Sequence, residues 1–264
     1  MAQWRLIPPM VAPGALHMAI DAWLLEQHLH HGHPPTLRFY TWDPPAISLG
    51  FSQRRNLPNH WHHLIWRGQP VELVQRPTGG RGVLHQGDLT YALVTSGIPG
   101  NRDQVYRHLC QFLIQGWGQL GISLHFGHAT RPDLRSPNCF SLATAADLVT
   151  PTGLKWIGSA QLRRGPAILQ HGAMRLHPDP DLYAQVFQTP APAPDSLPLL
   201  PSTTEMIDTL TQAAANTFGC TFLMQPLSPE ELAAIHAESP PGLICTSYRS
   251  GLGGSEGQEG DRER

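Results

Sequence analysis

Apolar side chains spaced three and four residues apart indicate helices in four parts of the chain. In the first part, Leu16, Ile20 and Leu24 share one helical face, and two adjacent prolines follow the segment. In the second part, Val105 and Leu109 follow the same spacing behind Asn101, a residue type that favours the N-cap. We therefore expect helices over residues 14–31, 102–120, 203–218 and 228–236.

Short runs of aliphatic, aromatic and β-branched residues fill most of the sequence between the first and third helices. Proline or glycine pairs bound many of these runs, as strands between turns require. We expect strands over residues 36–42, 46–50, 71–75, 89–94, 146–149, 154–157 and 167–170. A proline-rich spacer over 189–201 separates them from the last two helices.

Composition narrows the class of protein. Charged residues are 14% of the 264 residues and the formal net charge is −2, which argues against a disordered chain and against a nucleic-acid partner. No apolar run reaches the roughly 18 residues that span a bilayer, and the first 14 residues contain no leader-like apolar core. We expect a cytoplasmic globular protein that does not bind membranes.

A glycine-rich segment, residues 76–85, directly follows one predicted strand. Gly79 and Gly80 let the backbone approach a ligand closely, and Arg76 and Arg81 supply positive charge beside it. The pattern favours a ligand-binding loop, although an ordinary hairpin connection also uses paired glycines.

The four cysteines are scattered, which is typical of neither a disulfide scaffold nor a structural zinc site. Cys110 falls among apolar residues of a predicted helix and is expected to be a small buried side chain, and Cys220 is interpreted in the same way. Cys139 lies between a proline-marked loop and a β-rich segment. It is therefore the candidate nucleophile.

Lys155 is the single lysine among 18 basic residues, and it lies in an apolar strand where burial favours the neutral amine. Alternation places Lys155, Ile157 and Ser159 on one face of that strand. A protective lysine on an edge strand is the alternative.

Two of the histidines, His85 and His171, adjoin glycine-containing segments and are candidates for a pocket, or for structural hydrogen bonding. The clusters near residues 30 and 62 lack metal-site spacing, so no metal site is expected.

Taken in order, these segments resemble the lipoate- and biotin-protein ligase superfamily and, within it, the octanoyl-[acyl carrier protein]:protein N-octanoyltransferases. The matching stretches are HMAID (17–21), TLRFY (36–40), PAISLG (45–50), RPTGGR (76–81) with VLH (83–85), LTY (89–91), NCF (138–140), and KWIGSAQ (155–161) with LQHG (169–172).

The resemblance implies an α+β fold in which helices flank a mixed β-sheet, as in biotin and lipoate ligase catalytic domains. It places one catalytic domain over 1–246, with a core of about 14–188 and C-terminal helices within 202–240. The remaining tail, 247–264, is rich in Gly, Glu and Arg and is expected to be disordered. It also implies an acyl tunnel between the glycine-rich segment and the Lys155 strand. The substrate-binding residues expected there are Arg76, Gly79, Gly80, Arg81, His85, Gly158, Ala160 and His171.

In the transferase branch, a cysteine at the position of Cys139 carries the acyl group as a thioester, and a lysine at the position of Lys155 lowers the pKa of that thiol. The implied donor is octanoyl-acyl carrier protein, which carries the chain on phosphopantetheine. The implied acceptor is a lysine of an apo lipoyl domain or of a glycine-cleavage H protein. No cofactor of the enzyme itself, metal or ATP is expected.

Three alternatives stay open. The first is an ATP-dependent lipoate-protein ligase, a branch that generally lacks the nucleophile. The second is a homologue that binds lipoyl domains or carries an acyl group without turnover. The third is a transferase that takes its acyl group from another lipoyl-type domain.

Overall fold

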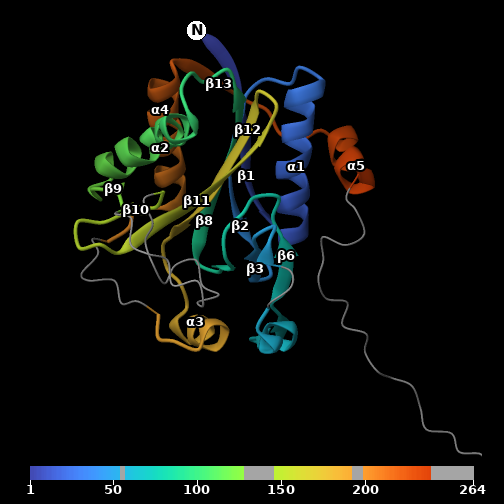
Figure 1. Cartoon of the computed structure of the whole chain (residues 1–264), viewed down its shortest axis with the longest axis vertical. Helices are drawn as coiled ribbons and strands as arrows, with labels where there is room; N and C mark the ends of the chain where they lie inside the picture. The colour runs from blue at the N-terminus through green and yellow to red at the C-terminus, as the bar shows by residue number, and fades with distance from the viewer. Residues whose placement is uncertain (54–56, 128–145, 192–198, 239–264) are drawn as a thin grey trace, which may run out of the picture.

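An eight-stranded mixed sheet forms the centre of the fold (Figure 1). The computed structural model of the chain describes residues 1–53, 57–127, 146–191 and 199–238. The first two strand pairs of the sheet are parallel, and the remaining pairs are antiparallel. In spatial order the strands are β13 (Cys220–Met224), β1 (Ala2–Ala12), β2 (Thr36–Trp42), β8 (Asp88–Ser96), β12 (Ala167–Arg175), β11 (Lys155–Arg164), β10 (Leu148–Val149) and β9 (His125–Phe126).

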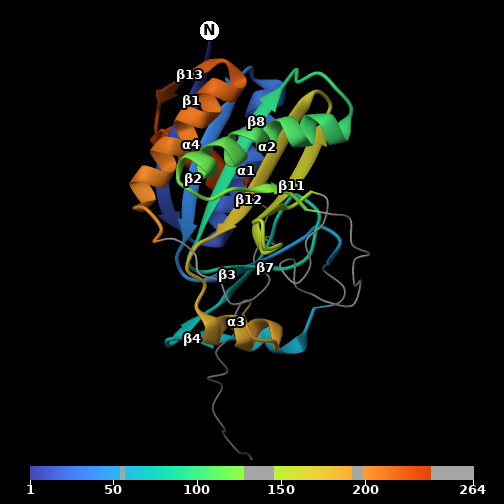
Figure 2. The same ribbon diagram turned by 90° about the vertical axis from the view of Figure 1, so that its left-hand side faces the viewer.

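Helices cover both faces of this sheet, which confirms the expected α+β class. Helices α2 (Arg102–Gln119) and α4 (Thr203–Phe218) pack together on one face, as Figure 2 shows. Helices α1 (Gly14–His30) and α5 (Pro229–Glu238) lie on the opposite face. The predicted cap of α2 is present, because Asn101 and Gln104 exchange side-chain to backbone hydrogen bonds of 2.9 Å each.

The central strand β8 contributes side chains to the apolar clusters on both faces of the sheet. Leu89, Tyr91 and Leu93 point into the apolar core under α2 and α4. Ala92 and Val94 alternate with them and point toward α1. Because helices cover both faces of this strand, β8 is buried over all but its last residue.

A smaller unit extends from the end of the large sheet. It contains the three strands β6 (Glu72–Gln75), β3 (Ala46–Leu49) and β7 (Val83–His85), and the hairpin of β4 (Ile65–Trp66) and β5 (Gln69–Pro70). Helix α3 (Pro180–Phe187) and the 3₁₀ turn Asn59–His63 pack around a separate apolar cluster there. The connection between β6 and β7 is the glycine-rich segment.

Several elements escaped the sequence patterns. Strand β1 carries Pro8 and Pro9 in its interior, and its pairing with β2 shifts register between Ile7 and Met10. Proline cannot donate to a ladder, so an irregularity at this point lets the strand continue. Strand β13 and helix α3 were also missed.

The expected alternation along the Lys155 strand fails at its first residues. Leu148 pairs with Ile157, whereas Val149 pairs with Lys155, so Trp156 is the extra residue of a bulge. Trp156 and Ile157 consequently both join the core under α2.

Most of the expected spacer (192–198) and the whole expected tail (247–264) lie outside the described residues. Within the described part of the chain, no helix combines the length and the apolar character that crossing a membrane requires.

Candidate active site

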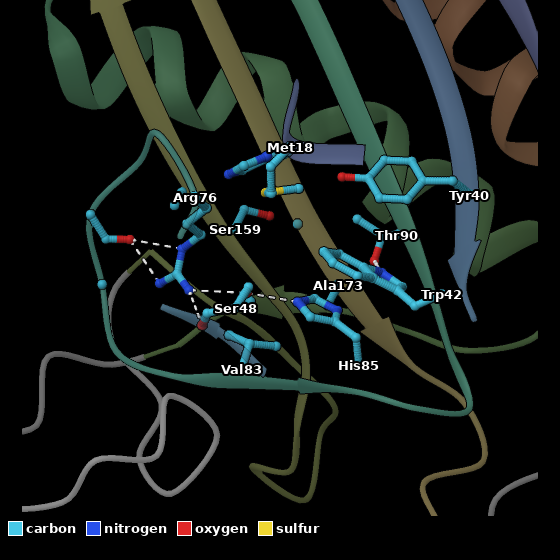
Figure 3. A pocket seen from close by; sticks show the side chains of 16 residues that line it. Met18, Tyr40, Trp42, Ser48, Arg76, Val83, His85, Thr90, Ser159 and Ala173 are labelled. Carbon is cyan, nitrogen blue, oxygen red and sulfur yellow. Dashed lines mark hydrogen bonds between the residues drawn. The ribbon is translucent and has the colours of Figure 1, made fainter. Parts of the chain in front are cut away.

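A partly open cavity lies between the α1-covered face of the large sheet and the glycine-rich segment (Figure 3). Met18 of α1 and Trp42 of β2 supply apolar walls. Strands β8, β11 and β12 supply the floor. Of the residues expected to bind substrate, the cavity is lined by Arg76, Gly79, Gly80, His85, Gly158, Ala160 and His171.

The glycine-rich segment, defined from here on as residues 76–82, is held close to β3. Gly80 has a φ of +102°, and a Cβ placed on Gly50 would lie 1.9 Å from the Gly80 carbonyl oxygen. The approach therefore requires glycine at both positions.

Arg76 turns its guanidinium back onto this part of the backbone. It donates to the carbonyls of Ser48 at 2.8 Å, Gly79 at 2.8 Å and Arg81 at 2.7 Å. We expected Arg76 and Arg81 to present charge to a ligand. Arg76 lines the cavity while also fixing the segment's shape, whereas Arg81 does not line the cavity and supplies a carbonyl to Arg76.

His85 links the segment's neighbouring strands to β8. Its Nδ1 lies 2.8 Å from an Asp88 carboxylate oxygen, and its Nε2 lies 2.8 Å from the Ser48 hydroxyl. Burial lowers the pKa of His85, so we assign a neutral ring that donates from Nδ1 to Asp88 and accepts from Ser48. Trp42 stacks on the ring with centroids 3.7 Å apart.

His171 makes a second link of the same kind. Its Nδ1 lies 2.8 Å from Asp21, and its Nε2 lies 2.7 Å from the hydroxyl of Thr78 in the glycine-rich segment. Asp21 also pairs with Arg38 at 3.2 Å and accepts from Tyr40 at 3.0 Å. Burial acts to raise the pKa of Asp21, but Arg38 and His171 outweigh burial and hold that pKa below its usual value.

Lys155 begins β11, the strand that also carries Gly158 and Ala160 into the cavity wall. Its ammonium lies 2.8 Å from the carboxylate of Asp147, and both side chains are buried. The carboxylate stabilises the ammonium against the cost of leaving water. Sequence reasoning missed Asp147, because its pairing with Lys155 arises from the β10–β11 hairpin and no local spacing marks it.

Tyr106 of α2 reaches the same corner of the molecule. Its hydroxyl lies 2.8 Å from the carbonyl of Ala146 and 3.1 Å from that of Ser159. It therefore ties the residue before Asp147 to the strand of Lys155.

The structure describes two of the three cysteines for which a role was expected. Cys139 lies outside the described residues. Cys110 is buried on α2, as expected, and burial raises the pKa of its thiol to about 12. Cys220 is buried as well, and burial raises its pKa to about 11.

Two members of the histidine clusters make structural hydrogen bonds. His28 bonds to the carbonyl of His33 and to the hydroxyl of Ser96, and His60 bonds to the carbonyl of Val186. Across the described residues, no three metal-ligating side chains gather in one place.

The family model of the lipoyl protein ligase A/B catalytic domain matches residues 13–215, and the chain belongs to that family. Among curated relatives, the protein named Octanoyltransferase LipM of Kyrpidia tusciae is 37% identical over 204 residues, covering 72% of each chain. The protein of the same name from Bacillus subtilis is 34% identical over 199 residues, covering 71% of this chain and 70% of its own.

Solved structures share the fold. A putative lipoate protein ligase from T. acidophilum with bound lipoic acid superposes with a TM-score of 0.71 at 21% identity, covering 89% of this chain and 94% of its own. A lipoate-protein ligase A bound with ATP gives a TM-score of 0.72 at 21% identity, covering 91% of this chain and 96% of its own. At this identity the likeness establishes the architecture alone.

Proposed function

We propose that this protein is an octanoyltransferase that moves an octanoyl group from acyl carrier protein to a lysine of a lipoyl domain or of a glycine-cleavage H protein. The observation that carries the proposal is the 37% identity, over 72% of both chains, to a relative named Octanoyltransferase LipM. The apolar cavity supports it, since Met18, Trp42, Val83 and Ala173 supply the surface that a saturated acyl chain needs.

The chemistry is ping-pong acyl transfer through Cys139. The Cys139 thiolate attacks the carbonyl carbon of the donor thioester, and the tetrahedral intermediate collapses to expel the phosphopantetheine thiolate. The Lys155 ammonium favours the Cys139 thiolate, and it then gives a proton to the departing thiolate. The acyl group is now a thioester on Cys139, and Lys155 is a neutral amine.

The second half returns each group to its starting state. The acceptor lysine attacks the Cys139 thioester as a neutral amine and loses a proton to Lys155, while the Cys139 thiolate departs. The product is an octanoyl amide on the acceptor. In this scheme Asp147 holds Lys155 in position through both proton transfers, at the 2.8 Å contact described above.

The scheme needs no metal or nucleotide, because the donor thioester is already activated. An ATP-dependent ligase differs here, since a free acid must first be adenylated. The 21% identity to a ligase bound with ATP speaks only for a shared fold.

The decisive experiment is intact-protein mass spectrometry after incubation with octanoyl-acyl carrier protein, without ATP. We expect an added octanoyl group that maps to Cys139 and disappears when apo lipoyl domain is supplied. Cys110→Ala serves as the matched control and should form the same adduct.

Other results identify the alternatives. Acceptor modification that requires ATP and free octanoate would move the protein to the ligase branch. A Cys139 adduct that never transfers would make it an acyl-binding homologue. Faster acylation by an octanoylated H protein than by acyl carrier protein would identify another lipoyl-type domain as the donor.

A further inference from the structure

The hydroxyl of Thr78 connects the glycine-rich segment to a buried polar network formed by His171, Asp21 and Arg38. Thr78 is 1% exposed and immediately precedes Gly79 and Gly80, whose backbone lines the cavity. Its side chain does not line the cavity. It points instead to His171, 2.7 Å away on β12.

The charge of Asp21 fixes one hydrogen-bond direction in this connection. Asp21 is wholly buried and is kept ionised by Arg38 and His171, so it can only accept hydrogen bonds. His171 therefore donates to Asp21 from Nδ1, and its Nε2 is hydrogen-bonded to the Thr78 hydroxyl. The segment is thereby bonded to a group anchored in both α1 and β2.

The segment needs such an anchor because of its glycines. Glycine has more backbone freedom to lose than any other residue, so two adjacent glycines form a wall only if their ends are fixed. Arg76 binds the carbonyls of Gly79 and Arg81, which shapes the turn itself. Among the described residues, the hydrogen bond between Thr78 and His171 is the side-chain contact that connects this turn to β12, a strand of the cavity floor.

We propose that Thr78 is a positioning residue that, through His171 and Asp21, fixes Gly79 and Gly80 against the acyl chain and so sets the protein's affinity for the acyl donor. The proposal rests on the proposed function, in which this cavity holds the octanoyl chain. Thr78 itself touches no reacting atom. Its effect belongs to the acylation half of the reaction, in which the chain must enter the cavity.

The test is Thr78→Val, which removes the hydroxyl and preserves the side-chain shape. We expect the octanoyl-acyl carrier protein concentration that half-saturates single-turnover acylation of Cys139 to rise about tenfold, since His171 loses its partner in a buried site. The limiting acylation rate should stay within about twofold of that of the unmodified protein. Thr78→Ser retains a hydroxyl and should restore most of the affinity.

Thr95→Val is the matched control. Thr95 is buried on β8, and its hydroxyl has no partner among the described residues, so the same substitution there removes no bond. It should leave the donor dependence unchanged. If Thr78→Val lowers the melting temperature but leaves the half-saturating concentration at the wild-type value, Thr78 is merely structural and the proposal is wrong.

A second readout does not depend on the reaction. Trypsin cleavage after Arg81 reports release of the segment, and it should be faster in Thr78→Val than in Thr95→Val or Thr78→Ser. Equal cleavage rates would overturn the proposal. If the unmodified protein forms no acyl adduct, the proposed function fails, while the trypsin comparison still tests whether Thr78 fixes the segment. Thr78→Ala supplies the same hydroxyl loss should the valine variant not fold.

Discussion

Both faces of the large sheet bury apolar side chains, but the face toward α1 also buries charged ones. Toward α2 and α4, the sheet contributes apolar residues such as Leu93, and the helices answer with residues such as Phe112 and Leu210. Toward α1, the same strands bury the ion pair of Arg38 and Asp21. Burial of apolar surface stabilises the face toward α2 and α4. On the face toward α1, each buried charge also needs a partner of opposite charge or a hydrogen bond.

Polar groups on the two faces behave accordingly. On the helical face, Gln170 donates to the Cys110 thiol at 3.3 Å, and burial keeps that thiol protonated by raising its pKa to about 12. On the pocket face, burial acts to raise the pKa of Asp21, but Arg38 and His171 together outweigh it and keep Asp21 ionised. Burial therefore suppresses ionisation on one face, and pairing preserves it on the other.

The largest effect is expected from a pair of cysteine substitutions, one at the proposed nucleophile and one on the helical face. Cys139→Ala should reduce octanoyl transfer by about a thousandfold or more, because no nucleophile remains to form the thioester. Cys110→Ala should leave turnover within about twofold, because the protonated thiol on the helical face takes no part. Steady-state transfer to apo lipoyl domain measures both variants. Normal transfer by Cys139→Ala would end the covalent mechanism.

Lys155→Arg separates charge from proton transfer. Arginine preserves the positive charge beside Asp147 but does not release a proton near neutral pH, so the transfer step should fall by about a hundredfold. Acylation of Cys139 should be less affected. Single-turnover assays of each half-reaction make the measurement, and wild-type rates in both halves would exclude Lys155 as the proton carrier.

Removing a partner on the pocket face should affect both stability and binding. Asp21→Asn leaves Arg38 buried without its counter-charge, and we expect a loss of about 3 kcal/mol in the free energy of unfolding. Leu210→Ala on the helical face should cost a similar ~3 kcal/mol by opening a cavity. Only Asp21→Asn should also weaken octanoyl-donor binding.

Urea denaturation and the half-saturating donor concentration test this pair of variants. Asp208→Asn on the exposed side of α4 is the control and should change the free energy of unfolding by less than about 0.5 kcal/mol. If Asp21→Asn and Leu210→Ala have equal half-saturating donor concentrations, the charged face contributes no more to donor binding than the helical face does.

A further prediction concerns the dependence of stability on pH. Burial, followed by Arg38, lowers the pKa of His17 to about 3, so below pH 6.5 the unfolded chain binds a proton that the folded chain does not. The stability from neutral His17 is therefore present above pH 6.5 and declines by up to about 1.4 kcal/mol per pH unit as the pH falls toward 3.

His17→Gln should reduce the slope of unfolding free energy against pH by up to one proton between pH 6 and 4. The exposed His108 on α2 supplies the control variant, His108→Gln, which should retain the wild-type slope. An unchanged slope in His17→Gln would contradict the assignment of a neutral buried ring.

Periodicity predicted the elements that carry a strong local signal. Helix α2 was expected at 102–120 and occurs at Arg102–Gln119, because its cap and apolar spacing are both local. Strand β1 was missed, since Pro8 and Pro9 read as breakers and its pairing is set by distant strands. Helix α3 was missed for a related reason: it is short, and the cluster it covers is assembled from residues far away in sequence.

Local sequence signals likewise identified some residues of the site and missed others. The glycine-rich segment, His85 and His171 were marked by local composition, and the structure places them around one cavity. Asp21, Thr78 and Asp147 were not singled out. Asp21 and Thr78 both act through His171, which lies 150 and 93 positions away along the chain, and Asp147 acts through Lys155 across the β10–β11 hairpin. No pattern in a single sequence contains that information.

The position of β1 has a consequence for the chain as it is synthesised. One edge of β1 can pair with β2 soon after both emerge, but the other edge pairs with β13, and Arg5 is held by Glu231, 226 residues later. Until β13 is made, β1 presents an open edge of the kind that recruits other chains. A nascent chain of this protein therefore depends on a strand more than 200 residues downstream to close the edge of β1.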